Sequence, residues 1–172
     1  MKKLLIVVDY QVDFVSGSLG FPSALELENK IVDRILDYEN NGDEVIFTLD
    51  THYDNYLETV EGIKLPVSHC IKNTVGHELY GSVKELALMH RVFEKETFGS
   101  SKLFDYLKEN HYDVVELCGV VTNICVISNA VIVKSALPNA NIIIHKDLVG
   151  SNDKVLEEKA FDIMKNLHME II

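Results

Sequence analysis

The stretch "LLIVVD", residues 4–9, is an apolar run rich in β-branched side chains that ends in a carboxylate. Polar and apolar residues do not alternate within it, so it predicts a strand buried on both faces, as in the middle of a parallel sheet. Further short apolar runs follow at 44–50, 113–119 and 140–147, and the last residues, "MEII" (169–172), add a candidate short edge strand.

Amphipathic stretches alternate with these runs and predict helices at 24–42, 100–111, 122–136 and 152–168. Strands that alternate with helices indicate βαβ units around a mostly parallel sheet. The chain has 172 residues, 47% of them hydrophobic, which suits one substantial core and not two. We therefore predict an α/β fold, a three-layer αβα sandwich that forms a single domain over residues 1–172.

The overall charge restricts the class of partner. A formal net charge of -11 leaves no basic face for a phosphate backbone, so we expect no nucleic acid and no membrane as partner, and instead a small neutral or cationic ligand. The apolar run before Asp9 is too short for a signal peptide, and no other run reaches membrane-spanning length, so we expect a cytoplasmic protein. Three cysteines without CxxC spacing indicate reduced thiols.

Reactive residue types gather at one edge of the predicted sheet. Asp9 ends the first strand, Asp50 ends the second, and Cys125 follows the third. Open parallel sheets bind ligands beyond the carboxyl ends of their strands. The regular pattern stops between 51 and 82, and a long irregular segment in a compact domain is usually either functional or disordered. Its apolar residues and varied composition favour function, so we predict a site at this edge.

Cys125 lies in "GVVTNICV" (119–126), in the first turns of the predicted helix 122–136. The positive end of a helix dipole would lower the pKa of its thiol and favour a nucleophilic thiolate. A cysteine with apolar neighbours is also a common core residue. Asp9 is either a solvated turn residue or a general base for this thiol, and Lys95 is either a surface lysine or its counter-charge.

A second group of candidates lies in "LDTHYDNYLETVEGIKLPVSHC" (49–70). Asp50 and His52, two residues apart in extended chain, project in the same direction. Glu58, Glu61 and His69 follow within reach of a folded-back loop. Imidazoles and carboxylates suit a divalent ion such as zinc, iron or manganese, although loop histidines are also common as polar surface.

Several motifs in order resemble the nicotinamidase/isochorismatase-like cysteine hydrolases, from Lys3 to about the last helix. They are "DYQVDF" (9–14), "DTH" (50–52), "HCIKNTVGHE" (69–78), "EKETF" (94–98) and "GVVTNICV" (119–126). The resemblance implies Cys125 as nucleophile, Asp9 as proton shuttle and Lys95 as electrostatic stabiliser. It also implies a cis peptide between Val120 and Val121, with the amides of Val121 and Cys125 as the oxyanion hole.

The resemblance also implies one bound metal ion, zinc with iron or manganese as alternatives. Asp50, His52 and His69 match the family's ligands directly. The fourth ligand is Glu58 or Glu61, depending on which spacing the chain follows, and we choose Glu61. Family members commonly assemble, so a homodimer or homotetramer is expected.

The resemblance also implies a class of substrate. Cys125 together with the metal set points to hydrolysis of a small carboxamide, nicotinamide above all, through a thioester. The alternatives are another small amide and a non-catalytic ligand-binding member of the fold. Phe14, Phe98 and Val120 are the implied pocket residues. Many nicotinamidases place a tryptophan where this chain has Ser68, and Tyr53 or Tyr56 would supply the ring instead.

Overall fold

The computed structural model describes residues 1–172 and has a six-stranded sheet in the order β3-β2-β1-β4-β5-β6. Every neighbouring pair is parallel. The strands are β1 (Lys3–Val8), β2 (Glu44–Asp50), β3 (Arg91–Lys95), β4 (Val114–Val120), β5 (Asn141–Gly150) and β6 (Glu170–Ile171). The predicted α/β fold is confirmed, and the sheet is wholly rather than mostly parallel.

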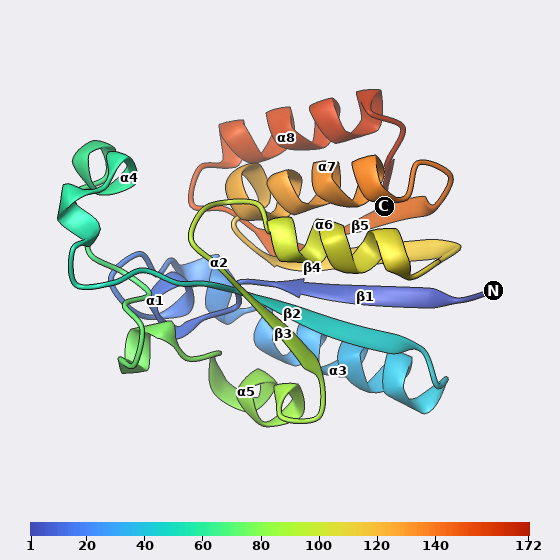
Figure 1. Ribbon diagram of the computed structural model, residues 1–172, viewed down its shortest axis with the longest axis horizontal. Coiled ribbons are helices and arrows are strands. Elements are labelled where there is room, and N and C mark those ends of the chain that lie inside the picture. Colours follow the sequence, from blue (N-terminus) through green and yellow to red (C-terminus); the bar gives the residue numbers. More distant parts are fainter.

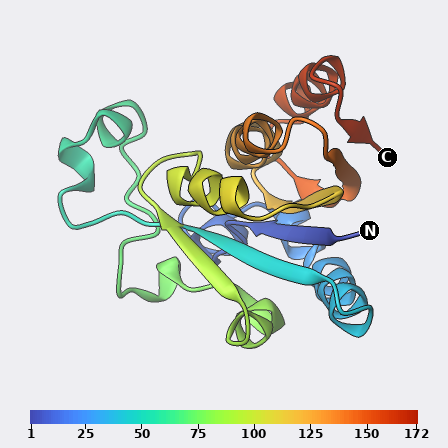
Figure 2. The same cartoon turned by 45° about the vertical axis from the view of Figure 1, so that its right-hand side comes forward.

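Helices cover both faces of this sheet (Figure 1). One layer contains α3 (Glu28–Asn40) and α5 (Gly81–Ala87), and the other contains α6 (Ser101–Glu109), α7 (Ile127–Ala136) and α8 (Lys154–Asn166). The turned view in Figure 2 shows the same two layers on opposite sides of the strands. No helix is long and apolar enough to cross a membrane.

Strand β1 explains why its sequence shows no alternation. Leu4, Ile6 and Val8 belong to one hydrophobic cluster, under α6, α7 and α8, whereas Leu5 and Val7 belong to the other, against α3 and α5. The five side chains are fully buried. Burial of each contributes about 1.5–3 kcal/mol, so both faces of the central strand are selected to be apolar.

The irregular segments contain short elements that the sequence pattern did not predict. These are α1 (Val12–Val15), α2 (Pro22–Leu25), α4 (Val60–Lys64), the 3₁₀ turns η1 (Tyr56–Glu58) and η2 (Val75–His77), and the π-helical turn η3 (Thr122–Val126); helix α5 and strand β3 were not predicted either. The predicted helix 122–136 thus begins with a π turn before α7. Pro22 begins α2, and a break at Glu26 and Leu27 separates α2 from α3, so the predicted helix 24–42 spans parts of two helices.

The strand order reverses between β1 and β4: from β1 the chain adds β2 and β3 toward one edge of the sheet, and from β4 it adds β5 and β6 toward the other. Close approach of these two strands requires Gly119, which has φ +107° and whose added Cβ would lie 2.1 Å from the Val8 carbonyl oxygen. Asp9, directly after β1, also has a left-handed backbone with φ 45°. Ligands of such sheets bind at this reversal, which is where the candidate residues lie.

Candidate active site

Three candidate residues from distant parts of the chain meet beyond the carboxyl ends of β1, β3 and β4. Lys95 Nζ lies 2.7 Å from Asp9 Oδ2 and 3.7 Å from Cys125 Sγ. All three side chains are buried. Such a buried group of an acid, a cation and a thiol has no evident use in packing alone, because removing charged groups from water is costly even when they are paired.

Asp9 is placed to accept a proton. Thr48 Oγ1 donates a 2.7 Å hydrogen bond to Asp9 Oδ1, whereas Oδ2 faces the Lys95 ammonium and accepts no hydrogen bond from any other group. Burial raises the pKa of the Asp9 carboxyl, and the neighbouring Lys95 opposes that shift. The left-handed backbone at Asp9 is of the kind that clusters at functional sites.

The sequence-based expectation for the thiol was wrong. Burial raises the pKa of Cys125, the Asp9 carboxylate raises it further, and Lys95 lowers it. The helix dipole that we expected to lower this pKa is outweighed by loss of water around the sulfur. Burial therefore favours the neutral form of this thiol, with the Asp9 carboxylate as its neighbour.

Lys95 remains charged in this environment. Burial alone would lower the pKa of its ammonium, but Asp9, Cys125 and Asp50 raise it. Its Nζ donates to Asp50 Oδ1 at 3.1 Å and to the Thr97 carbonyl at 3.0 Å. Strand β3 positions this lysine through its pairing with β2, where Asp50 and Lys95 stand side by side.

The turn between β4 and η3 presents backbone donors next to the thiol. The Val120–Val121 peptide bond is cis, as the resemblance implied. The Val121 amide donates no hydrogen bond within the protein, and Val121 lines the cavity that Cys125 also lines. A free amide in that position is able to stabilise a developing oxyanion.

The second candidate group also converges. One ligand atom from each of Asp50, His52, Glu61 and His69 lies within 4.8 Å of the others. His52 Nε2 is 3.0 Å from Asp50 Oδ2, and the Nε2 atoms of both histidines are 3.6 Å from Glu61 Oε1. The structure brings Glu61, and not Glu58, into this group.

The chemistry of these donors fits a divalent metal ion. Two imidazole nitrogens and two carboxylate oxygens form a set typical of zinc, iron and manganese sites. His69 Nδ1 is paired with the Val67 carbonyl at 2.8 Å, which orients Nε2 toward the group. Such a supporting hydrogen bond is characteristic of metal-ligating histidines.

Gln11 supports this site, and its role was not predicted from the sequence. Its fully buried side chain donates from Nε2 to the carbonyls of Asp50 and His77, and its Oε1 accepts from the Asp50 amide at 2.8 Å. Gln11 therefore fixes the backbone of one candidate ligand. It lies inside the quoted motif 9–14, but nothing in the pattern marks it as a buried hydrogen-bonding residue.

Asn129 is a second supporting residue that the sequence did not reveal. Its Nδ2 donates to the Cys125 carbonyl at 2.8 Å and to the Phe98 carbonyl at 3.1 Å, and its Oδ1 accepts from the Ser100 amide at 3.1 Å. The side chain is fully buried. Asn129 thus ties the turn that contains Cys125 to the loop that follows Lys95.

A cavity of about 200 Å³ lies between the two groups of candidates. Its lining residues are Phe14, Leu19, Phe21, Asp50, Glu61, Leu65, His69, Phe98, Val121, Ile124, Cys125 and Asn152. Phe14 and Phe98 line it, whereas Val120 is fully buried in the core against α3 and does not. Ser68, Tyr53 and Tyr56 are also absent from its walls, where Leu19 and Phe21 lie instead.

A buried thiol beside an acid, at the reversal point of an all-parallel sheet, is the arrangement of an α/β cysteine hydrolase. The sequence comparison makes this specific: the Isochorismatase domain model matches residues 3–172, so the chain belongs to the isochorismatase family.

Two relatives match over most of their length. The chain is 32% identical over 164 residues to the uncharacterized isochorismatase family protein PncA of Bacillus subtilis, covering 88% of this chain and 87% of that protein. It is 30% identical over 173 residues to the nicotinamidase of Saccharomyces cerevisiae, covering 75% of this chain and 80% of the nicotinamidase.

Solved structures confirm the predicted isochorismatase-like hydrolase fold. The nicotinamidase/pyrazinamidase PncA of Bacillus subtilis superposes with a TM-score of 0.88 at 29% identity, covering 99% of both chains. The pyrazinamidase of Pyrococcus horikoshii, solved in complex with zinc, gives 0.86 at 26% identity, covering 100% of this chain and 99% of the other.

Proposed function

We propose that this chain hydrolyses nicotinamide to nicotinate and ammonia through a thioester on Cys125. The chain is a hydrolase that acts on a linear amide C–N bond, consistent with its nicotinamidase relatives. The observation that carries the proposal is that one cavity contacts both the Cys125 thiol and three of the four candidate metal ligands. This reaction would place the chain in NAD salvage.

The cavity supports binding of one flat aromatic carboxamide. Phe14, Phe21 and Phe98 supply apolar walls for a ring, and Asp50, Glu61 and His69 form the polar end. A ring held between them would bring its carboxamide carbon to the Cys125 sulfur. Orientation of this kind converts attack into an effectively unimolecular step.

In the first half of the reaction, the Cys125 sulfur bonds to the carboxamide carbon as its proton passes to Asp9. The developing oxyanion accepts hydrogen bonds from the Val121 and Cys125 amides, each of which contributes about 3 kcal/mol of transition-state stabilisation. Asp9 then returns the proton to the nitrogen as the C–N bond breaks, so that ammonia leaves and a thioester remains. Lys95 stays charged throughout.

In the second half, water attacks the thioester carbonyl while Asp9 takes one of its protons. The C–S bond breaks, the acid leaves, and Asp9 returns that proton to the sulfur. Atoms and charges balance, with one amide and one water converted to acid and ammonia. The same carboxylate acts twice as base and twice as acid, which suits an Oδ2 that no group other than the Lys95 ammonium contacts through a hydrogen bond or ion pair.

Asp50, His52, Glu61 and His69 are the residues that would hold a divalent metal ion. When bound, the ion would supply a Lewis-acid contact for the ring nitrogen and so orient the carboxamide. We propose zinc, with iron or manganese as alternatives, and the zinc complex of the Pyrococcus horikoshii pyrazinamidase supports a metal at this fold.

Ammonia release from nicotinamide tests the proposal. Metal-replete protein should release ammonia, and Cys125→Ala should not. Chelation should reduce the rate, and added metal should restore it. If metal-replete wild-type protein releases no ammonia from nicotinamide, the nicotinamidase assignment is wrong, and a panel of other small amides then becomes the substrate search.

A further inference from the structure

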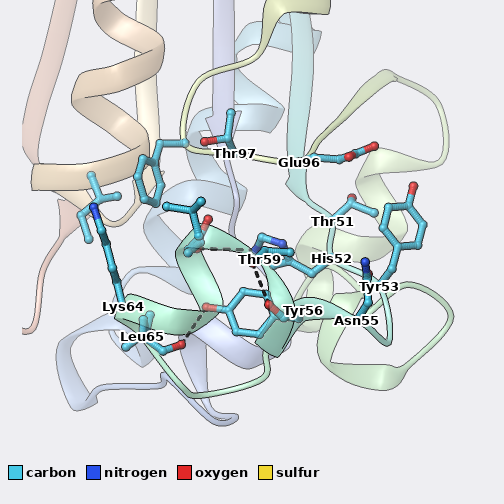
Figure 3. Close-up of a pocket in the computed structure, with 14 residues that line it drawn as sticks. Thr51, His52, Tyr53, Asn55, Tyr56, Thr59, Lys64, Leu65, Glu96 and Thr97 are labelled. Carbon is cyan, nitrogen blue, oxygen red and sulfur yellow. Dashed lines mark hydrogen bonds and ion pairs between the residues drawn. The ribbon is translucent and has the colours of Figure 1, made fainter.

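A larger groove adjoins the reaction cavity. It has a volume of about 650 Å³, and segment 51–65 forms one side while Glu96 and Thr97 lie across from it (Figure 3). Its lining residues are Thr51, His52, Tyr53, Asn55, Tyr56, Thr59, Val60, Glu61, Lys64, Leu65, Glu96, Thr97, Phe98 and Ile124. His52, Glu61 and Phe98 of this lining also serve the proposed site, but a nicotinamide held in the smaller cavity leaves the rest of the groove unfilled.

The groove is continuous with the reaction cavity. Glu61, Leu65, Phe98 and Ile124 line both. Glu61 belongs to the candidate metal group and Ile124 precedes Cys125 in the sequence, so the shared wall borders both groups between which a ring would be seated. One edge of such a ring would therefore face the groove.

Apart from Glu61, the shared wall is apolar and incompletely covered. Leu65 is 38% exposed, Phe98 43% and Ile124 39%, and all three side chains border both spaces. Apolar surface that borders a binding cavity gains free energy when a ligand covers it, by about 25 cal/mol per Å². A nicotinamide confined to the smaller cavity would leave the groove face of this wall in water.

We propose that the groove is an extension subsite for an apolar substituent, such as a phenyl group, on the ring of an aromatic carboxamide. The inference rests on the proposed function, because it takes the carboxamide to be held at Cys125. The substrates of this chain then include aromatic carboxamides larger than a single ring, with the reactive amide in the cavity and the substituent between Leu65, Phe98 and Ile124.

The test compares nicotinamide with nicotinamides that carry a phenyl group at the ring carbon meta or para to the carboxamide, by ammonia release. At least one phenyl compound should be hydrolysed with a kcat/KM within about tenfold of that for nicotinamide, because the apolar contact offsets the added bulk. Rejection of both phenyl compounds by enzyme that hydrolyses nicotinamide overturns the inference alone. No hydrolysis of any compound overturns the proposed function as well.

Two variants on α4 provide a matched pair. Val60 lines the groove and is 72% exposed, whereas Ile63 is 71% exposed and lines neither space. Val60→Trp should lower the preference for the phenyl compound over nicotinamide by about tenfold, since the indole occupies the subsite. Ile63→Trp adds a similar bulk to the same helix and should leave that preference unchanged.

The outcomes separate the possible occupants of the groove. Loss of preference in Val60→Trp alone supports the subsite. Equal preferences in both variants and the wild type refute it. Sedimentation of the variants adds a third outcome: if Val60→Trp breaks an oligomer without a change in preference, the groove is covered by a second copy of the chain and the inference is wrong.

Discussion

Replacement of Asn129 by leucine removes every hydrogen bond that this side chain makes while nearly conserving its volume. The Cys125 carbonyl and the Ser100 amide then lose buried partners, whereas the bond to the Phe98 carbonyl is only partly buried. Each buried group left unpaired costs about 1–3 kcal/mol, so two of them lower the free energy of unfolding by about 2–6 kcal/mol.

The same substitution should change the kinetics. Asn129 joins the turn that contains Cys125 to the loop that contains Phe98 of the cavity wall, and the Thr97 carbonyl of that loop accepts a hydrogen bond from Lys95. A shift of about 1 Å in such a support costs up to about 100-fold in rate, so kcat/KM for nicotinamide should fall by about 10- to 100-fold. Urea denaturation and steady-state ammonia release measure the two effects.

Tyr38→Phe is the matched control. Tyr38 donates a 3.1 Å hydrogen bond to the buried Glu116, on the α3 side of the sheet and outside the cavity. Its loss should lower stability by about 1 kcal/mol without a change in kcat or KM. The positioning role of Asn129 would be refuted if Asn129→Leu lost stability but kept wild-type kinetics at a temperature where it is folded.

Four further predictions follow from other parts of the molecule. Alkylation of Cys125 by iodoacetamide should be slow at neutral pH, and its rate should still rise at pH values above the ordinary thiol pKa, because burial and Asp9 raise the pKa of this thiol. Asp9→Asn should therefore speed alkylation at neutral pH while abolishing hydrolysis. Slower alkylation of Asp9→Asn would contradict the proposed effect of the Asp9 charge. Glu61→Gln should weaken binding of zinc by about tenfold or more in calorimetry, with Glu58→Gln as the control that leaves it unchanged. Gly119→Ala, whose Cβ would lie 2.1 Å from the Val8 carbonyl oxygen, should lose more than about 3 kcal/mol of stability. The control Gly42→Ala, with nothing within 4 Å of its Cβ, should lose only about 1–2 kcal/mol because of its positive φ. Equal losses of stability in thermal unfolding would refute the close-approach argument. Hydrogen bonds from Tyr106 and Tyr112 lower the pKa of Glu44, although burial opposes this shift. The carboxylate therefore stabilises the fold above its unfolded pKa, and this stabilisation is lost as pH falls through the folded pKa. Glu44→Gln should reduce the fall of the free energy of unfolding with decreasing pH.

The central strands could be predicted from the sequence because burial on both faces leaves a continuous apolar run, as in β1. Strand β3 gave no such signal. Arg91 and Val92 of this edge strand are exposed, and its last two residues, Glu94 and Lys95, are charged. The role of Lys95 therefore came from the resemblance, and its position at the end of a strand was not predicted.

Site residues that lie in the ordered motifs were predicted, whereas residues whose role depends on tertiary contacts were missed. Asp9, Lys95 and Cys125 meet as the resemblance implied. Gln11 and Asn129 act through buried bonds to backbone groups distant in the sequence, which no local pattern encodes. The predicted direction of the thiol pKa shift was wrong because the sequence indicates the start of a helix but not how deeply Cys125 is buried.

The central claim is that Cys125 forms a thioester with the substrate. Acid quenching during turnover of nicotinamide, followed by mass spectrometry, tests it most directly. The account predicts a nicotinoyl adduct on the peptide that contains Cys125, absent from Cys125→Ala, whose ammonia release should fall by at least about 10,000-fold. Ammonia release by Cys125→Ala at a rate near that of the wild type would contradict the claim.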